Sequence, residues 1–317
     1  PFFDLSSLLE AYLTSVKALA TPIEFSYTLQ TVAAFKEPGS VGRCLYERAA
    51  AMASDPNIEN WEWKLQLRHA HLNCRAPLVP FNSFWFSHPL STRIHAPAER
   101  AVLTATTLFG YMMKLDAGEM KPLALNEQEL ATVYHKWIFN ATRKPCLGSD
   151  EMIKAPRNDY CVVFRKASWV GILMSDNRQT WAEVRSRLSS QRRPGAYEQY
   201  QKRGMLRQLD AQNVKSIATI EAAALIICLD DASPTNATER AKQFHFGGKM
   251  DAANHWNDKS LQFVVCTYGV SGVIGEHTML DALTLTQLNK AMAMAIQKQP
   301  ATAHSLAEQI QGPHHCL

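Results

Sequence analysis

The residues of this sequence best suited to chemistry are His277 and Asp281, which stand four positions apart in the segment His-Thr-Met-Leu-Asp. A neutral histidine, with an unperturbed pKa of about 6.5, can take a proton from an attacking hydroxyl group at neutral pH. A nearby carboxylate can stabilise the imidazolium directly, or it can pair with a cation and hold the turn in place. The pattern predicts general base catalysis. Its alternative is a packed structural histidine, because eleven histidines make a chance match easy.

A predicted β-hairpin positions His277. Residues 261–266 form a nearly continuous apolar run, Tyr268 and Gly269 supply a turn, and a second apolar run covers residues 270–275. Apolar residues at helical spacing then predict a helix, namely Leu285, Leu288, Met292 and Ala295. We therefore expect His277 where a buried strand leads into a helix, a rigid position that suits a catalytic group.

The rest of residues 151–317 alternates between strands and helices. Residues 160–164 and 168–174 predict two short strands, and residues 225–229 predict a buried strand. Helices are expected after the N-cap candidate Asp176, as far as about residue 188, and over residues 213–224. Two polar stretches are expected to be rich in loops, residues 193–212 and 231–250. This alternation indicates the α/β class.

Residues 1–150 are predicted to be mainly helical. Helical spacing connects Leu8, Leu9, Tyr12, Leu13 and Val16, and further helical patterns cover residues 60–72 and 101–115. Pro38 and Gly39 are expected to interrupt a helical stretch. Three prolines predict an irregular connection between the later helices, namely Pro77, Pro80 and Pro89.

Composition narrows the class of protein further. The 317 residues carry a formal net charge of +4 and no basic run, which argues against a nucleic-acid surface. Seven cysteines without Cys-x-x-Cys spacing indicate a reducing compartment, either the cytoplasm or an organellar matrix, and predict neither a disulfide framework nor a metal site. We expect no membrane span, because no apolar run is long enough. The start at Pro1 is expected to be a domain boundary or a processed end.

Several motifs in order resemble the choline/carnitine acyltransferase family. The main one is Asn-His-Trp-Asn-Asp-Lys-Ser-Leu-Gln-Phe at residues 254–263, followed by Gly269, Gly272 and Glu276-His277. Residues 175–182, ending in Arg-Gln-Thr-Trp-Ala, resemble a second family segment, and residues 216–230 resemble the helix–strand unit after it. Departures occur at His255, where the family usually has arginine, and at Asn257, where it usually has an aromatic residue.

The resemblance implies that residues 1–317 are the N-terminal half of a two-domain acyltransferase. The implied fold is like chloramphenicol acetyltransferase, with a mixed sheet flanked by helices. His277 matches the family's catalytic base, and Asp281 matches the acidic residue four positions later. The implied substrates are a small hydroxyl acceptor and an acyl thioester of coenzyme A or of a carrier-protein phosphopantetheine, with no tightly bound cofactor. Trp256, Asp258 and Lys259 are expected to fix the hairpin and its approach loop.

Three functional readings follow. In the first, the chain is a fragment or domain of a longer multidomain protein, such as a fungal polyketide synthase that releases its product by acyl transfer. In the second, it is half of an ordinary carnitine or choline acyltransferase. In the third, it is a non-catalytic half that binds an acyl ligand or a partner. In the family the complementary C-terminal half supplies the oxyanion donors, so we expect this polypeptide alone to be inactive or nearly so.

Overall fold

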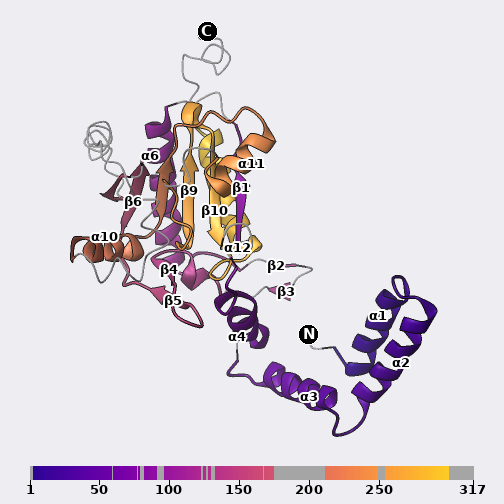
Figure 1. Ribbon diagram of the computed structural model, residues 1–317. Helices are drawn as coiled ribbons and strands as arrows, with labels where there is room; N and C mark the ends of the chain where they lie inside the picture. The colour runs from indigo at the N-terminus through magenta and orange to yellow at the C-terminus, as the bar shows by residue number, and fades with distance from the viewer. Residues whose placement is uncertain are drawn as a thin grey trace. The chain divides into compact units, whose positions relative to one another are not determined.

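The computed structural model is shown in Figure 1. It describes residues 3–58, 60–76, 78, 82–90, 96–122, 124–125, 128–129, 133–166, 168–174, 211–248 and 254–299. The chain forms two compact units, Pro1–Gln66 and Leu67–Leu317. The expected change from mainly helical to α/β near residue 150 therefore falls inside the second unit.

The first unit is helical, as the sequence predicts. Its helices are α1 (Leu5–Lys17), α2 (Pro22–Lys36), α3 (Val41–Ser54) and α4 (Trp61–Gln66). Each of the first three starts at a polar N-cap, and Thr21 forms a capping box with Glu24 at the start of α2. Gly39 adopts a φ of +79° between α2 and α3, so Pro38-Gly39 ends the helix as expected.

The second unit contains a six-stranded mixed sheet in the order β1-β10-β9-β8-β6-β7. The strands are β1 (Ser83–Ser87), β6 (Tyr160–Arg165), β7 (Ser168–Leu173), β8 (Ile226–Leu229), β9 (Leu261–Val265) and β10 (Ser271–Glu276). The pairs β6–β8 and β8–β9 are parallel, and the other neighbours are antiparallel. The predicted strands and the hairpin of β9 and β10 are thus confirmed, with the short 3₁₀ turn η4 (Thr267–Gly269) joining the hairpin.

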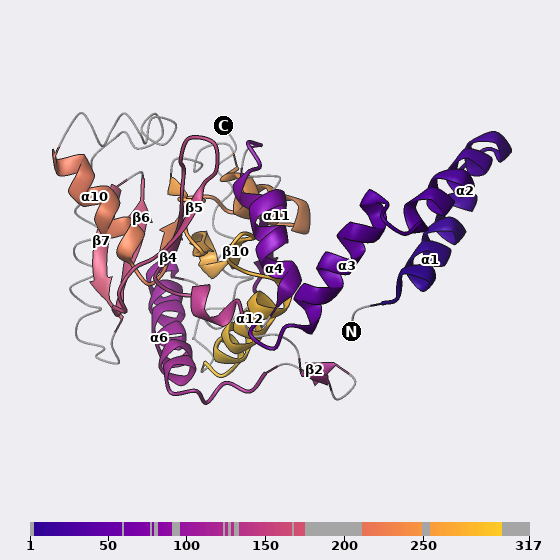
Figure 2. The ribbon, with the colours of Figure 1, turned by 90° about the horizontal axis from the view of Figure 1, so that it is seen from below.

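Helices cover both faces of this sheet. The core on one face joins α6 (Pro97–Asp116) and α12 (Ala282–Gln297) to inward residues such as Val163 and Phe263. The core on the other face joins α10 (Ala211–Ala222) and α11 (Ala237–Phe246) to the alternate strand residues, such as Val162 and Val264. Figure 2 shows α6 and α12 on the opposite side of the sheet from α10 and α11.

Small elements complete the second unit. They are the π-helical turn η1 (Leu67–Leu72), the 3₁₀ turn η2 (His135–Trp137), and the two-stranded pairs β2 (Ala124–Leu125) with β3 (Gln128–Glu129) and β4 (Ala141–Lys144) with β5 (Glu151–Lys154). Residues 60–72 therefore form an α-helix followed by a π-helical turn. None of the described helices is both long and apolar enough to cross a membrane.

Two expectations were wrong. Residues 231–250 are not mainly loop, because α11 occupies Ala237–Phe246. Its capping signals outweigh its polar composition: the Asn236 side chain accepts from the N–H of Glu239, and Gly247 ends the helix with a φ of +69°.

The irregular connection between prolines also contains a strand, since β1 pairs along the edge of β10. The proline-rich flanks concealed the short apolar run Phe-Trp-Phe at its centre. The predicted helix after Asp176, the motif at residues 175–182 and the polar stretch 193–210 lie outside the described residues.

Candidate active site

His277 lies in a tight turn between β10 and α12, as the sequence predicts. Its main-chain N–H donates to the carbonyl oxygen of Asn82 at 2.9 Å. The carbonyl oxygen of Glu276 accepts from the N–H groups of Met279 and Leu280, each at 3.1 Å. Because both of those side chains are fully buried, the apolar core holds the turn in place.

The His277 ring is half-buried against an aromatic wall. Its centroid lies 4.8 Å from that of Phe84 and 5.4 Å from that of His71. Ring atom Nδ1 is buried and has no hydrogen-bond partner in the structure. Nδ1 is thus closed to solvent, and Nε2 is the other ring nitrogen that can accept a proton.

Asp281 lies at the start of α12, where it acts as the N-cap. Its Oδ1 accepts a hydrogen bond from the N–H of Thr284 at 2.7 Å. Within the described residues it forms no ion pair with an arginine. The structure thus brings Asp281 to the turn that carries His277, but it joins the carboxylate to the helix backbone and not to the imidazole.

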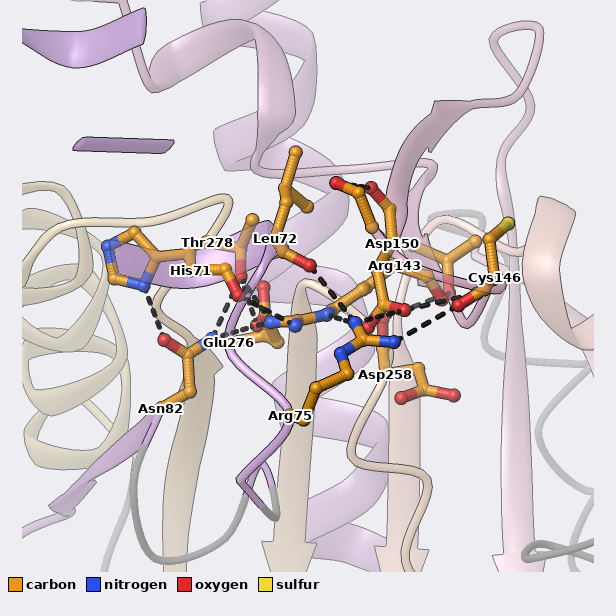
Figure 3. A network of polar contacts seen from close by, with 12 residues as sticks. His71, Leu72, Arg75, Asn82, Arg143, Cys146, Asp150, Asp258, Glu276 and Thr278 are labelled. Atoms are coloured by element: carbon orange, nitrogen blue, oxygen red, sulfur yellow. Dashed lines mark hydrogen bonds and ion pairs between the residues drawn. The ribbon is translucent and has the colours of Figure 1, made fainter. Parts of the chain in front are cut away.

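A buried ionic network supports the turn from behind. Arg143, on β4, lies 3.3 Å from Glu276 through Nη1 and 2.8 Å from Asp150 through Nε. The side chains of Arg143 and Glu276 are only 2% and 1% exposed. Arg75 joins the outer end of the network, where its Nη2 contacts Asp150 at 2.7 Å; the Arg75 side chain is half-exposed. Figure 3 shows this series of charges running from Glu276 outward to Asp150.

The inner end of the network includes polar groups from three segments. Asn82 Nδ2 donates to Glu276 Oε1 at 2.5 Å and to Thr278 Oγ1 at 2.8 Å. Thr278 in turn donates to Glu276 Oε1 at 2.6 Å and accepts from Arg143 Nη1 at 2.9 Å. The side-chain amide oxygen of Asn82, Oδ1, contacts Nδ1 of His71. Residues on both sides of His277 in the chain are thereby fixed (Figure 3).

Glu276 is a titratable group with a displaced pKa. Burial raises the pKa of Glu276 to about 7, although hydrogen bonds from Thr278 and Asn82 and the charge of Arg143 act in the opposite direction. A carboxyl whose pKa is higher in the folded state binds more protons there, so its contribution to stability is largest below the unfolded pKa. That contribution is lost as the pH rises from about 4.5 to about 7.

We predict that Glu276→Gln removes this pH dependence. The stability of the wild type relative to the variant should fall as the pH rises from about 4.5 to about 7, by at most about 1.4 kcal/mol per pH unit. The pH dependence of this stability difference is measured from the thermal unfolding midpoints of both proteins at four pH values between 4.5 and 8. A difference that does not change with pH would show that Glu276 does not titrate in this window.

The family-like block at residues 254–263 has structural partners. Lys259 Nζ donates to the carbonyl of Glu221 at 2.7 Å, and Asp258 accepts through its main-chain oxygen from Arg143 at 2.7 Å. The Trp256 ring stacks on Phe164 at 6.2 Å. These contacts hold the approach to the hairpin, in line with the structural role expected for the three residues.

His255, at the position where the family usually has arginine, is also buried. Its Nε2 lies 2.9 Å from Asp230 Oδ2. Asn254 and Gln243 donate to the same carboxylate at 2.8 and 2.7 Å. The described residues contain no cluster of three or more histidine, cysteine or acidic side chains that could hold a metal ion.

Sequence reasoning missed three residues of the site, namely His71, Asn82 and Arg143. They come from a π-helical turn, the start of an edge strand and a short outer strand, which are far from His277 in the chain. No local spacing connects them to the hairpin. Neither β1 nor β4 was among the predicted strands, so no signal in the sequence analysis pointed to Asn82 or Arg143.

The fold is a mixed α/β sheet flanked by helices, with a histidine at a strand-to-helix turn, and comparison with known proteins identifies the family. A sequence model described as Choline/Carnitine o-acyltransferase matches residues 1–169 and 197–315. The chain therefore belongs to the choline/carnitine O-acyltransferase family.

Two kinds of relatives are similar to the chain. The highly reducing polyketide synthase ltbA of Aspergillus luteorubrus is 32% identical over 93% of this chain and 10% of its own length. The mitochondrial carnitine O-acetyltransferase of Saccharomyces cerevisiae is 22% identical over 94% of this chain and 48% of its own length.

A solved chloramphenicol acetyltransferase aligns with a TM-score of 0.37 and 10% identity, over 75% of this chain and 96% of its own. The chain spans about a tenth of the length of the polyketide synthase and about half of that of the yeast carnitine O-acetyltransferase.

Proposed function

We propose that this chain supplies the general base of an O-acyltransferase, and that the base is His277. The observation that carries the proposal is the supported turn: a half-exposed imidazole on a rigid strand-to-helix connection, with its Nδ1 buried and its neighbours Glu276 and Thr278 fixed by Arg143. Family membership adds the reaction class, because the relatives include choline and carnitine O-acetyltransferases.

The proposed reaction is direct acyl transfer. Nε2 of His277 takes the proton of the acceptor hydroxyl while the oxygen attacks the thioester carbonyl carbon. The tetrahedral intermediate collapses when its carbon–sulfur bond breaks. His277 returns the proton to the departing thiolate, so that an ester and a thiol leave and the base is restored. Transfer in the reverse direction uses the same groups.

The other polar residues of the turn have positioning roles in this proposal. Asp281 fixes the start of α12 through its cap at Thr284, and it takes no proton. Glu276 and Arg143 hold the end of β10, which sets the place from which the His277 backbone emerges. A displacement of about 1 Å in a catalytic group can lower a rate about 100-fold, so this rigidity matters to the chemistry.

The donor is proposed to be an acyl thioester of coenzyme A or of a carrier-protein phosphopantetheine. The 32% identity to a polyketide synthase region over 93% of the chain favours the carrier-bound donor, and release of a product as an ester. The choline and carnitine O-acetyltransferases that are 22–25% identical to the chain match it over only about half of their own length. We therefore propose that groups from the region corresponding to their other half complete the site.

An activity comparison tests the proposal. A longer protein that also holds the region matching the second half of the acetyltransferases should transfer acyl groups from acyl-coenzyme A to at least one of carnitine, choline and glycerol. Residues 1–317 alone should be slower by at least about 10²–10³-fold, since each missing oxyanion donor costs about that much in kcat. Equal rates for the two proteins would contradict the proposal that groups beyond residues 1–317 complete the site. If the longer protein transferred no acyl group, a non-catalytic binding role would be favoured.

A further inference from the structure

His71 is a second histidine at the site, and the proposed reaction does not use it. It lies in η1, the π-helical turn, and π-helical geometry is frequent at functional sites. Its carbonyl oxygen accepts from Arg143 Nη2 at 2.9 Å, while the next carbonyl, of Leu72, accepts from the N–H of Asp150 at 2.9 Å. The network that supports the His277 turn therefore also holds His71 in place (Figure 3).

The hydrogen bonds of Asn82 determine which nitrogen of His71 carries a hydrogen. Its amide nitrogen donates to the carboxylate of Glu276, which fixes the orientation of the amide. The amide oxygen therefore faces His71 as an acceptor, and Nδ1 of His71 must be the donor. In the neutral ring this leaves a lone pair on Nε2 of His71.

The surroundings of the His71 ring favour its neutral form. Burial lowers the pKa of His71 and the charge of Arg143 lowers it further, while the hydrogen bond that His71 donates to Asn82 acts in the opposite direction. The titratable groups around the two rings are Glu276, behind the turn, and Arg143, on β4; Phe84 is the apolar contact from β1.

The His277 ring needs an acceptor of the kind that His71 offers. A base that acts through Nε2 carries its own hydrogen on Nδ1, and a buried N–H without an acceptor is costly. Nδ1 of His277 is buried and has no hydrogen-bond partner in the structure, and the recorded hydrogen bond of the Asp281 carboxylate is the cap to Thr284. The two ring centroids lie 5.4 Å apart. An N–H···N bond needs about 3 Å between nitrogens plus about 1 Å from each nitrogen to its ring centre, which is close to this separation.

We propose that His71 is a positioning residue that accepts the Nδ1 hydrogen of His277 and so fixes the tautomer in which Nε2 is the base. The bond closes by rotation of the half-exposed His277 ring about its Cβ–Cγ bond. Glu276 thus orients Asn82, Asn82 sets the tautomer of His71, and His71 sets that of His277. This inference rests on the proposed role of His277 as the base.

Variants of His71 in the longer, active protein test this inference. His71→Phe keeps a ring but removes the acceptor, so kcat should fall at least about tenfold, within the roughly 10⁴-fold that a wrong tautomer costs a serine protease. KM should change less than kcat. An acceptor on Nδ1–H stabilises the protonated ring, so its loss should move the acid side of the kcat/KM profile to lower pH.

Two further variants separate positioning from folding. His71→Gln, which keeps a carbonyl acceptor, should recover part of kcat. His69→Phe replaces an exposed histidine of the same turn and should match the wild type in rate and pH profile. If His277→Ala abolishes transfer but His71→Phe keeps the wild-type kcat and pH profile, this inference is wrong and the base assignment stands. If His277→Ala is fully active, the proposed function itself fails.

Discussion

Arg143→Ala is expected to destabilise the protein by about 3–5 kcal/mol, the usual cost of removing one partner of a buried ion pair. Arg143 is 2% exposed and contacts two carboxylates, of Glu276 and Asp150, and the hydroxyl of Thr278. Its removal leaves Glu276 buried without its cation. Urea unfolding with linear extrapolation measures the change.

A matched control exists on the same network. Arg75 also pairs with Asp150, at 2.7 Å, but its side chain is 50% exposed. An exposed pair contributes about 0–1 kcal/mol, so Arg75→Ala should have a small effect. The double variant Arg143→Ala/Glu276→Gln should recover stability relative to Arg143→Ala, because no buried carboxylate then remains unpaired. Equal destabilisation by the two arginine variants would contradict the network.

The parts of the fold that a local pattern determines could be predicted from the sequence. The hairpin of β9 and β10 and the helix after it are continuous apolar or periodic runs, and they place His277 correctly at their junction. Periodicity also predicted α1, although it did not predict burial, because Leu8 and Tyr12 of that helix are 42% and 51% exposed. Helical spacing identifies a helix, whereas burial depends on what packs against it.

The polar support of the site could not be predicted, because its partners are distant in the chain. Asn82 and Arg143 reach Glu276 across 194 and 133 positions, and neither belongs to a recognisable spacing. The role of Asp281 as a helix cap could also not be predicted from the His-x-x-x-Asp spacing. His-x-x-x-Asp suggests a carboxylate beside an imidazole, but the start of α12 places that carboxylate over free backbone N–H groups, which it caps.

His277→Ala is expected to lower kcat for acyl transfer by at least about 10²–10⁴-fold, the usual contribution of a general base. The stability should change little. The His277 side chain forms no hydrogen bond with the described residues, its ring is half-buried, and its backbone N–H, which bonds Asn82, remains in the variant. A lower kcat at unchanged stability would therefore report the loss of the catalytic group and not unfolding of the protein.

The most direct measurement is kcat of the longer protein for transfer from acyl-coenzyme A to its best hydroxyl acceptor, with and without His277→Ala, at matched thermal unfolding midpoints. His69→Ala, on the exposed side of η1, serves as the control for loss of a histidine. We predict that His277→Ala loses at least about 100-fold in kcat while the control matches the wild type. A His277→Ala protein that transfers acyl groups at the wild-type rate would contradict the assignment of His277 as the base.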